Sequence, residues 1–118
     1  MRELKFRTLI VFVFMLHFFL LTNLSAQDLP EELFAEGDSA LLNGDYENAL
    51  HYYSEYIKIV DNNPKAYLNR GVVNVSLKNY RDALDDYSIA IELDSDNSGA
   101  YASRGSLFII LEDYTNAK

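Results

Sequence analysis

The chain has 118 residues, which is enough for one small domain but not for the core of a large enzyme. Its 18 acidic and 10 basic residues give a formal net charge of −8, and no cluster of Lys and Arg is present to neutralise a phosphate backbone. The chain has no cysteine, which excludes disulfides, thiolate catalysis and Cys-based zinc sites. We therefore expect no nucleic-acid partner.

The N-terminal segment has the layout of a secretory signal peptide. Three basic residues in the first seven positions precede a mostly apolar run at 9–21, and the small residues Ser25 and Ala26 follow. The run is shorter than the roughly 20 residues that a membrane span needs. We therefore expect residues 1–26 to be a signal peptide and the remaining chain to lie outside the cytoplasm, either in the periplasm or secreted.

The predicted cleavage site follows Ala26, and residues 27–29 are expected to form a short linker. Leu24 stands where a small residue is preferred, so an uncleaved N-terminal anchor remains an alternative. Such an anchor would be the chain's only contact with a membrane. Because the segment 1–26 carries a net charge of +2, the remainder of the chain carries −10.

From position 30 onwards the chain repeats itself at a 34-residue spacing, which divides it into units at 30–63 and 64–97 and an incomplete unit at 98–118. Small and aromatic residues are the ones that coincide. The aligned sets are Gly37, Gly71 and Gly105; Tyr46, Tyr80 and Tyr114; Ala49, Ala83 and Ala117; and the pairs Tyr53 with Tyr87, Ser54 with Ser88 and Pro30 with Pro64.

Each unit is predicted to be a pair of helices. In the second unit, apolar residues recur at helical spacing from Tyr80 to Ile91, while acidic residues take the opposite face. A preceding helix is expected to start at Pro64, with Asn63 as its cap. Turns are predicted within the pairs at 43–45, 77–79 and Glu112-Asp113, and between the pairs at 61–64 and 94–99.

Small residues are predicted to set the distance between the two helices of a unit. The aligned glycines would let the first helix approach the second at the aligned alanines, and the aligned tyrosines would fill the space towards the neighbouring unit. Burial of one such ring contributes about 2 kcal/mol. The predicted packing residues are Gly37, Ala49, Tyr53, Gly71, Ala83, Tyr87 and Gly105.

The order of Gly, Tyr, Ala and a second aromatic at a 34-residue period resembles the tetratricopeptide repeat (TPR) family. The resemblance is strongest in residues 43–50, NGDYENAL, and in residues 66–71, AYLNRG, which residues 100–105 echo as AYASRG. It implies an all-α fold, an α-solenoid of antiparallel helix pairs in a right-handed superhelix with about two and a half repeats. Tyr56 and Asn74 depart from the family's usual residue types, and we expect both to weaken local packing.

The resemblance also implies a function, because TPR arrays bind extended peptides or partner helices on the concave surface formed by their first helices. We therefore expect a non-catalytic scaffold with a protein or peptide partner and no small-molecule substrate. Any one residue of this surface could instead only pack between helices. The residues that the resemblance places there are Phe34, Asp38, Leu41, Lys65, Leu68, Asn69, Val72, Val75, Ser76, Ser106 and Ile109.

The same surface does not resemble the carboxylate clamp of TPR domains that bind the acidic tails of chaperones. Of the clamp residues only Asn69 is matched, and Phe34, Asp38, Gly99 and Ser103 stand in place of the others. Capture of an acidic C-terminus is therefore not expected.

The third unit stops at Lys118, one turn into its predicted second helix and without a polar cap. Two interpretations stay open. The chain could be the N-terminal part of a longer exported protein whose activity lies downstream, or its uncapped end could self-associate or fit onto a partner.

No catalytic, cofactor or metal site is expected. His51 is the only histidine after the signal segment, and it shares the predicted exposed side of a helix with Glu55. Residues 94–99 resemble the opening of a calcium loop, but Gly105 occupies the position of the closing carboxylate. The stretch is better interpreted as a turn between helices.

Overall fold

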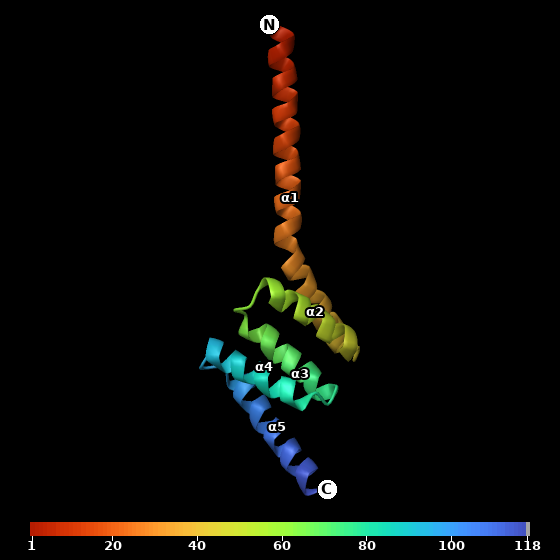
Figure 1. Cartoon of the computed structure of the whole chain (residues 1–118), viewed down its shortest axis with the longest axis vertical. Helices are drawn as coiled ribbons and strands as arrows, with labels where there is room; N and C mark the ends of the chain where they lie inside the picture. Colours follow the sequence, from red (N-terminus) through yellow and green to blue (C-terminus); the bar gives the residue numbers. More distant parts are fainter. Residues whose placement is uncertain (118) are drawn as a thin grey trace. The chain divides into compact units, whose positions relative to one another are not determined.

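A computed structural model describes residues 1–117 of the chain, apart from the side chains of residues 22–27 (Figure 1). The described residues form α-helices and no strands, which confirms the all-α prediction. The helices are α1 (Arg2–Leu42), α2 (Tyr46–Ile59), α3 (Pro64–Ser76), α4 (Tyr80–Leu93) and α5 (Ser98–Asn116). They divide into two compact units, Met1–Glu31 and Glu32–Lys118.

The first compact unit is the N-terminal part of α1. Its stretch Arg2–Leu21 has a mean hydropathy of 2.0 and is not buried, so by length and composition it is able to cross a membrane. A helix of this length spans about 30 Å, the thickness of a bilayer core. This stretch contains the apolar run at 9–21 and adds Leu4 and Phe6, which stand among the charged residues of the first seven positions. A signal sequence passes the same test, so both interpretations of this segment remain.

The predicted linker at 27–29 is helical and lies inside α1, and Pro30 does not end the helix. The predicted cleavage point after Ala26 falls where the side chains lie outside the described residues. The second compact unit starts at Glu32, close to the predicted start of the first repeat at position 30.

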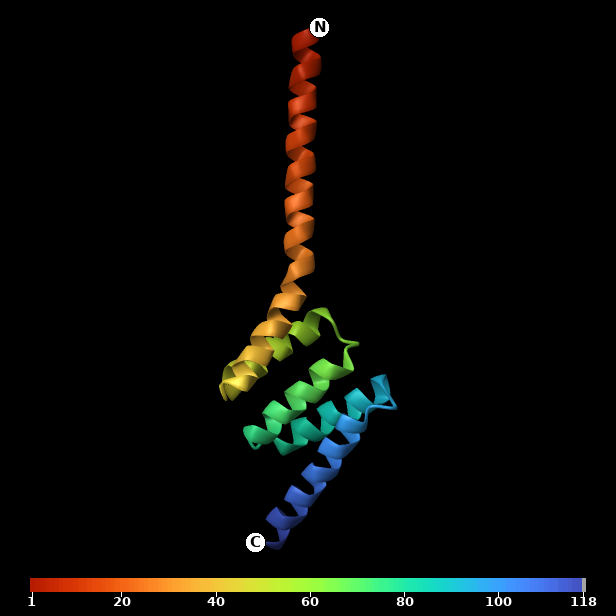
Figure 2. The ribbon, with the colours of Figure 1, turned by 180° about the vertical axis from the view of Figure 1, so that it is seen from behind.

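Within the second compact unit, successive helices are joined by tight turns and stack in chain order from α2 to α5 (Figures 1 and 2). Gly44 and Lys78 occupy equivalent positions in the first two repeats and have φ angles of +72° and +63°, the left-handed conformation that reverses the chain. The turns predicted at 43–45 and 77–79 are therefore confirmed. Asparagines cap the N-termini of α3 and α5. Asn63 Oδ1 accepts from Lys65 N at 3.0 Å, and Asn97 Oδ1 accepts from Ala100 N at 3.0 Å.

The turn predicted at Glu112-Asp113 was wrong, because α5 continues through both residues to Asn116. Glu112 is the counterpart of Gly44 and Lys78, and a left-handed conformation there would cost about 1–2 kcal/mol. In the described residues no further helix packs on α5 beyond this point to offset that cost. The predicted turn at 94–99 is likewise shorter, since Ser98 and Gly99 already belong to α5.

Tyrosine rings are the groups that lie nearest to Gly37 and Gly71. A Cβ atom added to Gly37 would lie 2.8 Å from the Tyr53 ring, and one added to Gly71 would lie 2.4 Å from the Tyr87 ring. The predicted approach of these glycines to Ala49 and Ala83 stays a prediction, and both alanines are fully buried. The predicted packing role of Gly105 is not realised, since nothing lies within 4 Å of its added Cβ.

Gly71→Ala should destabilise the fold by about 1–3 kcal/mol, because the new methyl group overlaps the Tyr87 ring. Gly105→Ala is the matched control on the next helix, where the open space should allow a gain of up to about 1 kcal/mol from helix propensity. Guanidinium unfolding followed by circular dichroism measures both changes. Equal changes in the two variants would contradict this account of the helix pairs.

Candidate peptide-binding face

The first-helix face is the set of eleven predicted binding residues on residues 32–42 of α1, on α3 and on α5. Phe34 contributes to it from α1 and is half-buried. Its ring packs edge-on against Tyr56 at a centroid distance of 5.0 Å, and Lys65 Nζ from α3 lies 5.4 Å from its centroid. The structure therefore brings Phe34 and Lys65 together, as a cation over an aromatic ring.

A polar cluster on the same face joins the first repeat to the second. The Tyr53 hydroxyl donates to Asp38 Oδ1 at 2.5 Å, and Asn69 Nδ2 donates to Asp38 Oδ1 at 3.0 Å and to the Tyr53 oxygen at 3.2 Å. Burial raises the pKa of Tyr53 well above its usual range, and the Asp38 carboxylate raises it further. Asp38 and Asn69 therefore already have partners within the protein, which limits what they can offer a ligand.

A hollow of about 240 Å³ lies between α3 and α5. Val75 and Ser106, both predicted as binding residues, line it together with the Tyr87 ring from α4. Its remaining lining residues are Ala102, Ser103, Leu107 and Ile110. A mostly apolar wall with two serine hydroxyls suits a small apolar side chain with a polar neighbour.

The other predicted residues divide into packed and exposed ones. Leu41 and Leu68 are half-buried against the core clusters, so they serve mainly as packing. Val72 and Ile109 are 37% and 64% exposed, and Ser76 is exposed with its hydroxyl donating to the Val72 carbonyl at 3.2 Å. Val72 and Ile109 are thus the apolar side chains of the face that are free to contact a partner.

Comparison with known proteins identifies this helical arrangement. The sequence model of the tetratricopeptide repeat matches residues 64–97, the stretch that the 34-residue period assigns to the second unit. The TPR domain of Arabidopsis OM64 superposes with a TM-score of 0.70 at 28% identity, over 76% of this chain and 74% of that one. Residues 64–97 are thus a tetratricopeptide repeat, and the helical fold is that of TPR domains.

Two further similar structures are TPR domains with bound ligands. The TPR2B domain of yeast Sti1 in its pHsp70 complex has a TM-score of 0.69 at 29% identity, over 75% of this chain and 71% of that one. The second TPR domain of human RPAP3, in complex with the HSP70 peptide SGPTIEEVD, has a TM-score of 0.64 at 27% identity, over 75% and 77%. No curated protein sequence matches the chain. The TPR fold is a non-catalytic scaffold for protein interaction.

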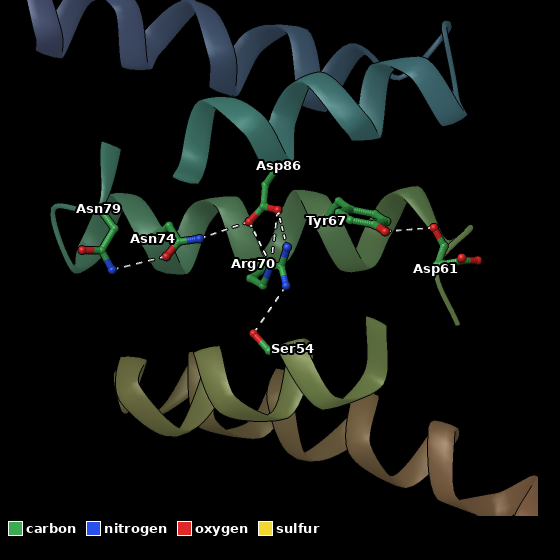
Figure 3. A network of polar contacts seen from close by, with 7 residues as sticks. All are labelled: Ser54, Asp61, Tyr67, Arg70, Asn74, Asn79 and Asp86. Atoms are coloured by element: carbon green, nitrogen blue, oxygen red, sulfur yellow. Dashed lines mark hydrogen bonds and ion pairs between the residues drawn. The ribbon is translucent and has the colours of Figure 1, made fainter. Parts of the chain in front are cut away.

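Sequence reasoning missed a polar network that ties three TPR helices together (Figure 3). Arg70 of α3 forms a bidentate ion pair with Asp86 of α4, with Nη2 2.7 Å from Oδ1 and Nε 3.0 Å from Oδ2. Arg70 Nη1 also donates to Ser54 of α2 at 3.4 Å. Burial lowers the pKa of Arg70, but the hydrogen bond and charge of Asp86 outweigh it and raise the pKa overall. The recurrence of Arg70 at Arg104 and of Ser54 at Ser88 was the signal that could have pointed to it.

Two departures from the TPR pattern, Asn74 and Tyr56, are buried and hydrogen-bonded. Asn74 is buried and donates through Nδ2 to Asp86 Oδ2 at 3.1 Å, so an amide takes the place of an aromatic ring to complete the ion pair. Tyr56 is 5% exposed, and its hydroxyl accepts from Asn63 Nδ2 at 2.8 Å. Its size is accommodated because the Phe34 ring packs against it.

Tyr53→Phe should destabilise the TPR array by about 1.5 kcal/mol near neutral pH, since it removes a hydrogen bond to a charged group. It should also change the response to alkali. An unfolded tyrosine titrates near pH 10 and the folded Tyr53 titrates higher, so the unfolded state loses its proton first and stability falls as the pH rises above about 10.

Urea unfolding from pH 8 to pH 11.5 measures this effect. The wild type should lose stability above pH 10 with a steeper slope than the Tyr53→Phe variant, by up to about 1.4 kcal/mol per pH unit. Burial also raises the pKa of Tyr87, so part of the loss of stability with rising pH remains in both proteins. Identical slopes would show that Tyr53 ionises normally in the folded protein.

Proposed function

We propose that this TPR array is a non-catalytic scaffold that holds an extended peptide or a partner helix on the first-helix face, outside the cytoplasm. The observation that carries the proposal is the hollow of about 240 Å³ lined by Val75 and Ser106. Val72, which is apolar and exposed, precedes Val75 by three residues on α3. Support comes from the similar TPR domains of Sti1 and RPAP3, whose structures are complexes with pHsp70 and with an HSP70 peptide.

The charges of the face favour an apolar or mixed peptide over an acidic one. Lys65 is the one basic side chain among the eleven residues, and it already lies over the Phe34 ring. Asp38 adds a carboxylate to the same face. The RPAP3 ligand SGPTIEEVD carries two glutamates and a final aspartate, and such a peptide would meet like charge here with little to compensate it.

The binding test uses peptides selected against the full chain from a library of displayed, unstructured peptides. Val72→Asp combined with Ser106→Asp should lower the affinity for the selected peptides at least tenfold, because two carboxylates then lie among the apolar side chains of the first-helix face. Both positions are exposed, so helicity should be unchanged. Val75 is unsuitable for such a test because it packs against the core cluster around Ala83 and Leu107.

A charge-matched control places the same two carboxylates in exposed turns, as Asn62→Asp with Ser95→Asp. These changes should leave peptide affinity within about twofold of the wild type. Selected peptides that bind the Val72→Asp, Ser106→Asp variant as tightly as the wild type would rule out the first-helix face as the ligand site.

Export is supported by the basic start and apolar run of residues 1–26 and can be tested separately. A fusion of the whole chain to a reporter that is active only outside the cytoplasm should be active in a bacterial host. Deletion of residues 2–21 should abolish the activity, because no other segment of the described residues is apolar enough to direct export. A reporter that remains active after the deletion would remove the case for an exported protein. The mass of the processed product then separates cleavage after Ala26 from an uncleaved anchor.

A further inference from the structure

The hollow between α3 and α5 has a counterpart one repeat earlier, where the chain places a cluster of its own polar side chains. There the Tyr53 hydroxyl donates to Asp38 Oδ1 at 2.5 Å, and Asn69 Nδ2 donates to the same oxygen at 3.0 Å and to the Tyr53 oxygen at 3.2 Å. At the 34-residue period, the counterparts of the tyrosine, the aspartate and the asparagine are Tyr87, Val72 and Ser103. The tyrosine is thus kept, while an isopropyl group replaces the carboxylate and a shorter hydroxyl replaces the amide.

The Tyr87 hydroxyl keeps a donor beside it but loses the acceptor that Tyr53 has. The Tyr87 side chain is 2% exposed and lines the hollow. Burial raises the pKa of Tyr87, and Ser103 lowers it, which is the effect of a group that donates to the phenol oxygen. Val72 cannot accept the phenol proton as Asp38 does in the first cluster. The Tyr87 proton is therefore available to an acceptor that enters the hollow.

The remaining lining of the hollow suits a side chain with an apolar stem and a polar head. Val75, Leu107 and Ile110 form its apolar wall, and Ser106 adds a hydroxyl that is able to donate or accept. A purely apolar side chain would leave the buried Tyr87 hydroxyl without a partner and without water. A carboxamide brings both an acceptor for that proton and N–H groups for the serine oxygens.

Charge distinguishes the carboxamide from a carboxylate, which would also accept the Tyr87 proton. None of the residues that line the hollow is basic. The charge of Asp86, the neighbour of Tyr87 on α4, already acts to raise the pKa of the tyrosine, and the whole chain carries a formal net charge of −8. A second carboxylate would meet this repulsion in a partly desolvated place, whereas a neutral amide would not.

The hollow is a feature of the pair α3 and α5, and a helix placed after α5 would leave it open. Ser106 and Ile110 line it from α5, and their counterparts on α3 are Val72 and Ser76. Both counterparts are exposed although α5 follows α3. The first-helix face therefore stays accessible at these positions inside the array.

We propose that the hollow between α3 and α5 binds the carboxamide side chain of an asparagine or glutamine in the peptide held on the first-helix face. Its carbonyl oxygen accepts from the Tyr87 hydroxyl, its N–H groups donate to the Ser103 and Ser106 oxygens, and its methylene groups lie on Val75 and Leu107. The inference rests on the proposed function, because it names the residue type that this face selects in its peptide.

The probe is the tightest-binding peptide from the displayed library whose affinity the Val72→Asp, Ser106→Asp variant lowers at least tenfold. Bound to the full chain in detergent micelles, one carboxamide of the peptide should show nuclear Overhauser effects between its N–H protons and the Tyr87 ring. Replacement of that residue in the peptide, asparagine by aspartate or leucine and glutamine by glutamate or methionine, should weaken binding about tenfold.

Tyr87→Phe is the matched variant of the protein, since it removes the hydroxyl and keeps the ring against Gly71. It should weaken binding of the carboxamide peptide several-fold and leave the leucine or methionine peptide within about twofold, so that the discrimination between them is lost. Ser106→Ala, at an exposed position where folding is unaffected, should reduce the same discrimination. Tyr53→Phe is the control and should keep it, because the Tyr53 hydroxyl serves the internal cluster.

The outcomes separate this inference from the proposed function. Peptides that bind the first-helix face but tolerate leucine or methionine at every asparagine and glutamine would overturn the carboxamide site alone. Tighter binding of the aspartate or glutamate peptide would assign the hollow to a carboxylate. Discrimination that survives both Tyr87→Phe and Ser106→Ala would locate the carboxamide elsewhere. Selected peptides that bind the Val72→Asp, Ser106→Asp variant as tightly as the wild type would contradict the proposed function, and this inference with it.

Discussion

The packing of a tyrosine ring against a glycine across each helix pair determines how this array is built. At Gly37 and Gly71 even a methyl group would lie within 2.8 and 2.4 Å of the ring, so the two helices can approach only because the side chain is absent. The same tyrosines reach the following unit through their hydroxyls. The Tyr53 hydroxyl accepts from Asn69 at 3.2 Å, and Tyr87 lines a hollow together with Ser103. One residue type thus sets both the spacing within a unit and the register between units.

The same tyrosines limit what the first-helix face can recognise. Its polar groups, Asp38 and Asn69, are held by Tyr53 and by each other, so they are rigid and partly satisfied before any ligand arrives. The side chains without an internal partner are mainly apolar, Val72 and Ile109 among them. The polar side chains of this face are held in place and its apolar side chains are exposed. Such a face favours binding by shape complementarity and burial of apolar surface, and the protein loses little conformational entropy when the ligand binds.

The sequence predicted the fold because its periodic residues are the ones that packing constrains most. Glycine and alanine at a 34-residue spacing indicate where helices cross. The turns at 43–45 and 77–79 contain Gly44 and Lys78, which reverse the chain. The contact partners were harder to predict. Ala49 and Tyr53 lie one turn apart on the same stripe of α2, and spacing alone does not decide which of them lies nearer to Gly37.

Two other features were beyond single-sequence reasoning for physical reasons. Asn74 stands where the TPR pattern has an aromatic residue, and Asp86 belongs to the predicted polar face of its helix. Only their contact at 3.1 Å across two helices shows that the two buried groups satisfy one another. The missing turn at Glu112-Asp113 has the opposite origin. Its residues suit a turn, but a turn forms only where a following helix rewards the reversal, and in the described residues α5 simply continues. Within the predicted face, spacing alone could not separate packed Leu68 from exposed Val72.

Within residues 1–117 the array is asymmetric along its length, and this bears on why α5 is helical although these residues leave one of its sides uncovered. Ala100 and Leu107 are buried, so α5 is attached to the preceding helices through one face, and burial of a leucine contributes about 2 kcal/mol. The arginine–aspartate ion pair occurs in the second unit and not in the first, because Glu36 and Tyr52 occupy the first-unit positions of Arg70 and Asp86. Arg104 continues that chemistry on α5 with donors to spare, and because it is only half-buried, water can solvate them. Arg104 can therefore keep the position that Arg70 has on α3 without an aspartate beside it, because water takes the place of the carboxylate.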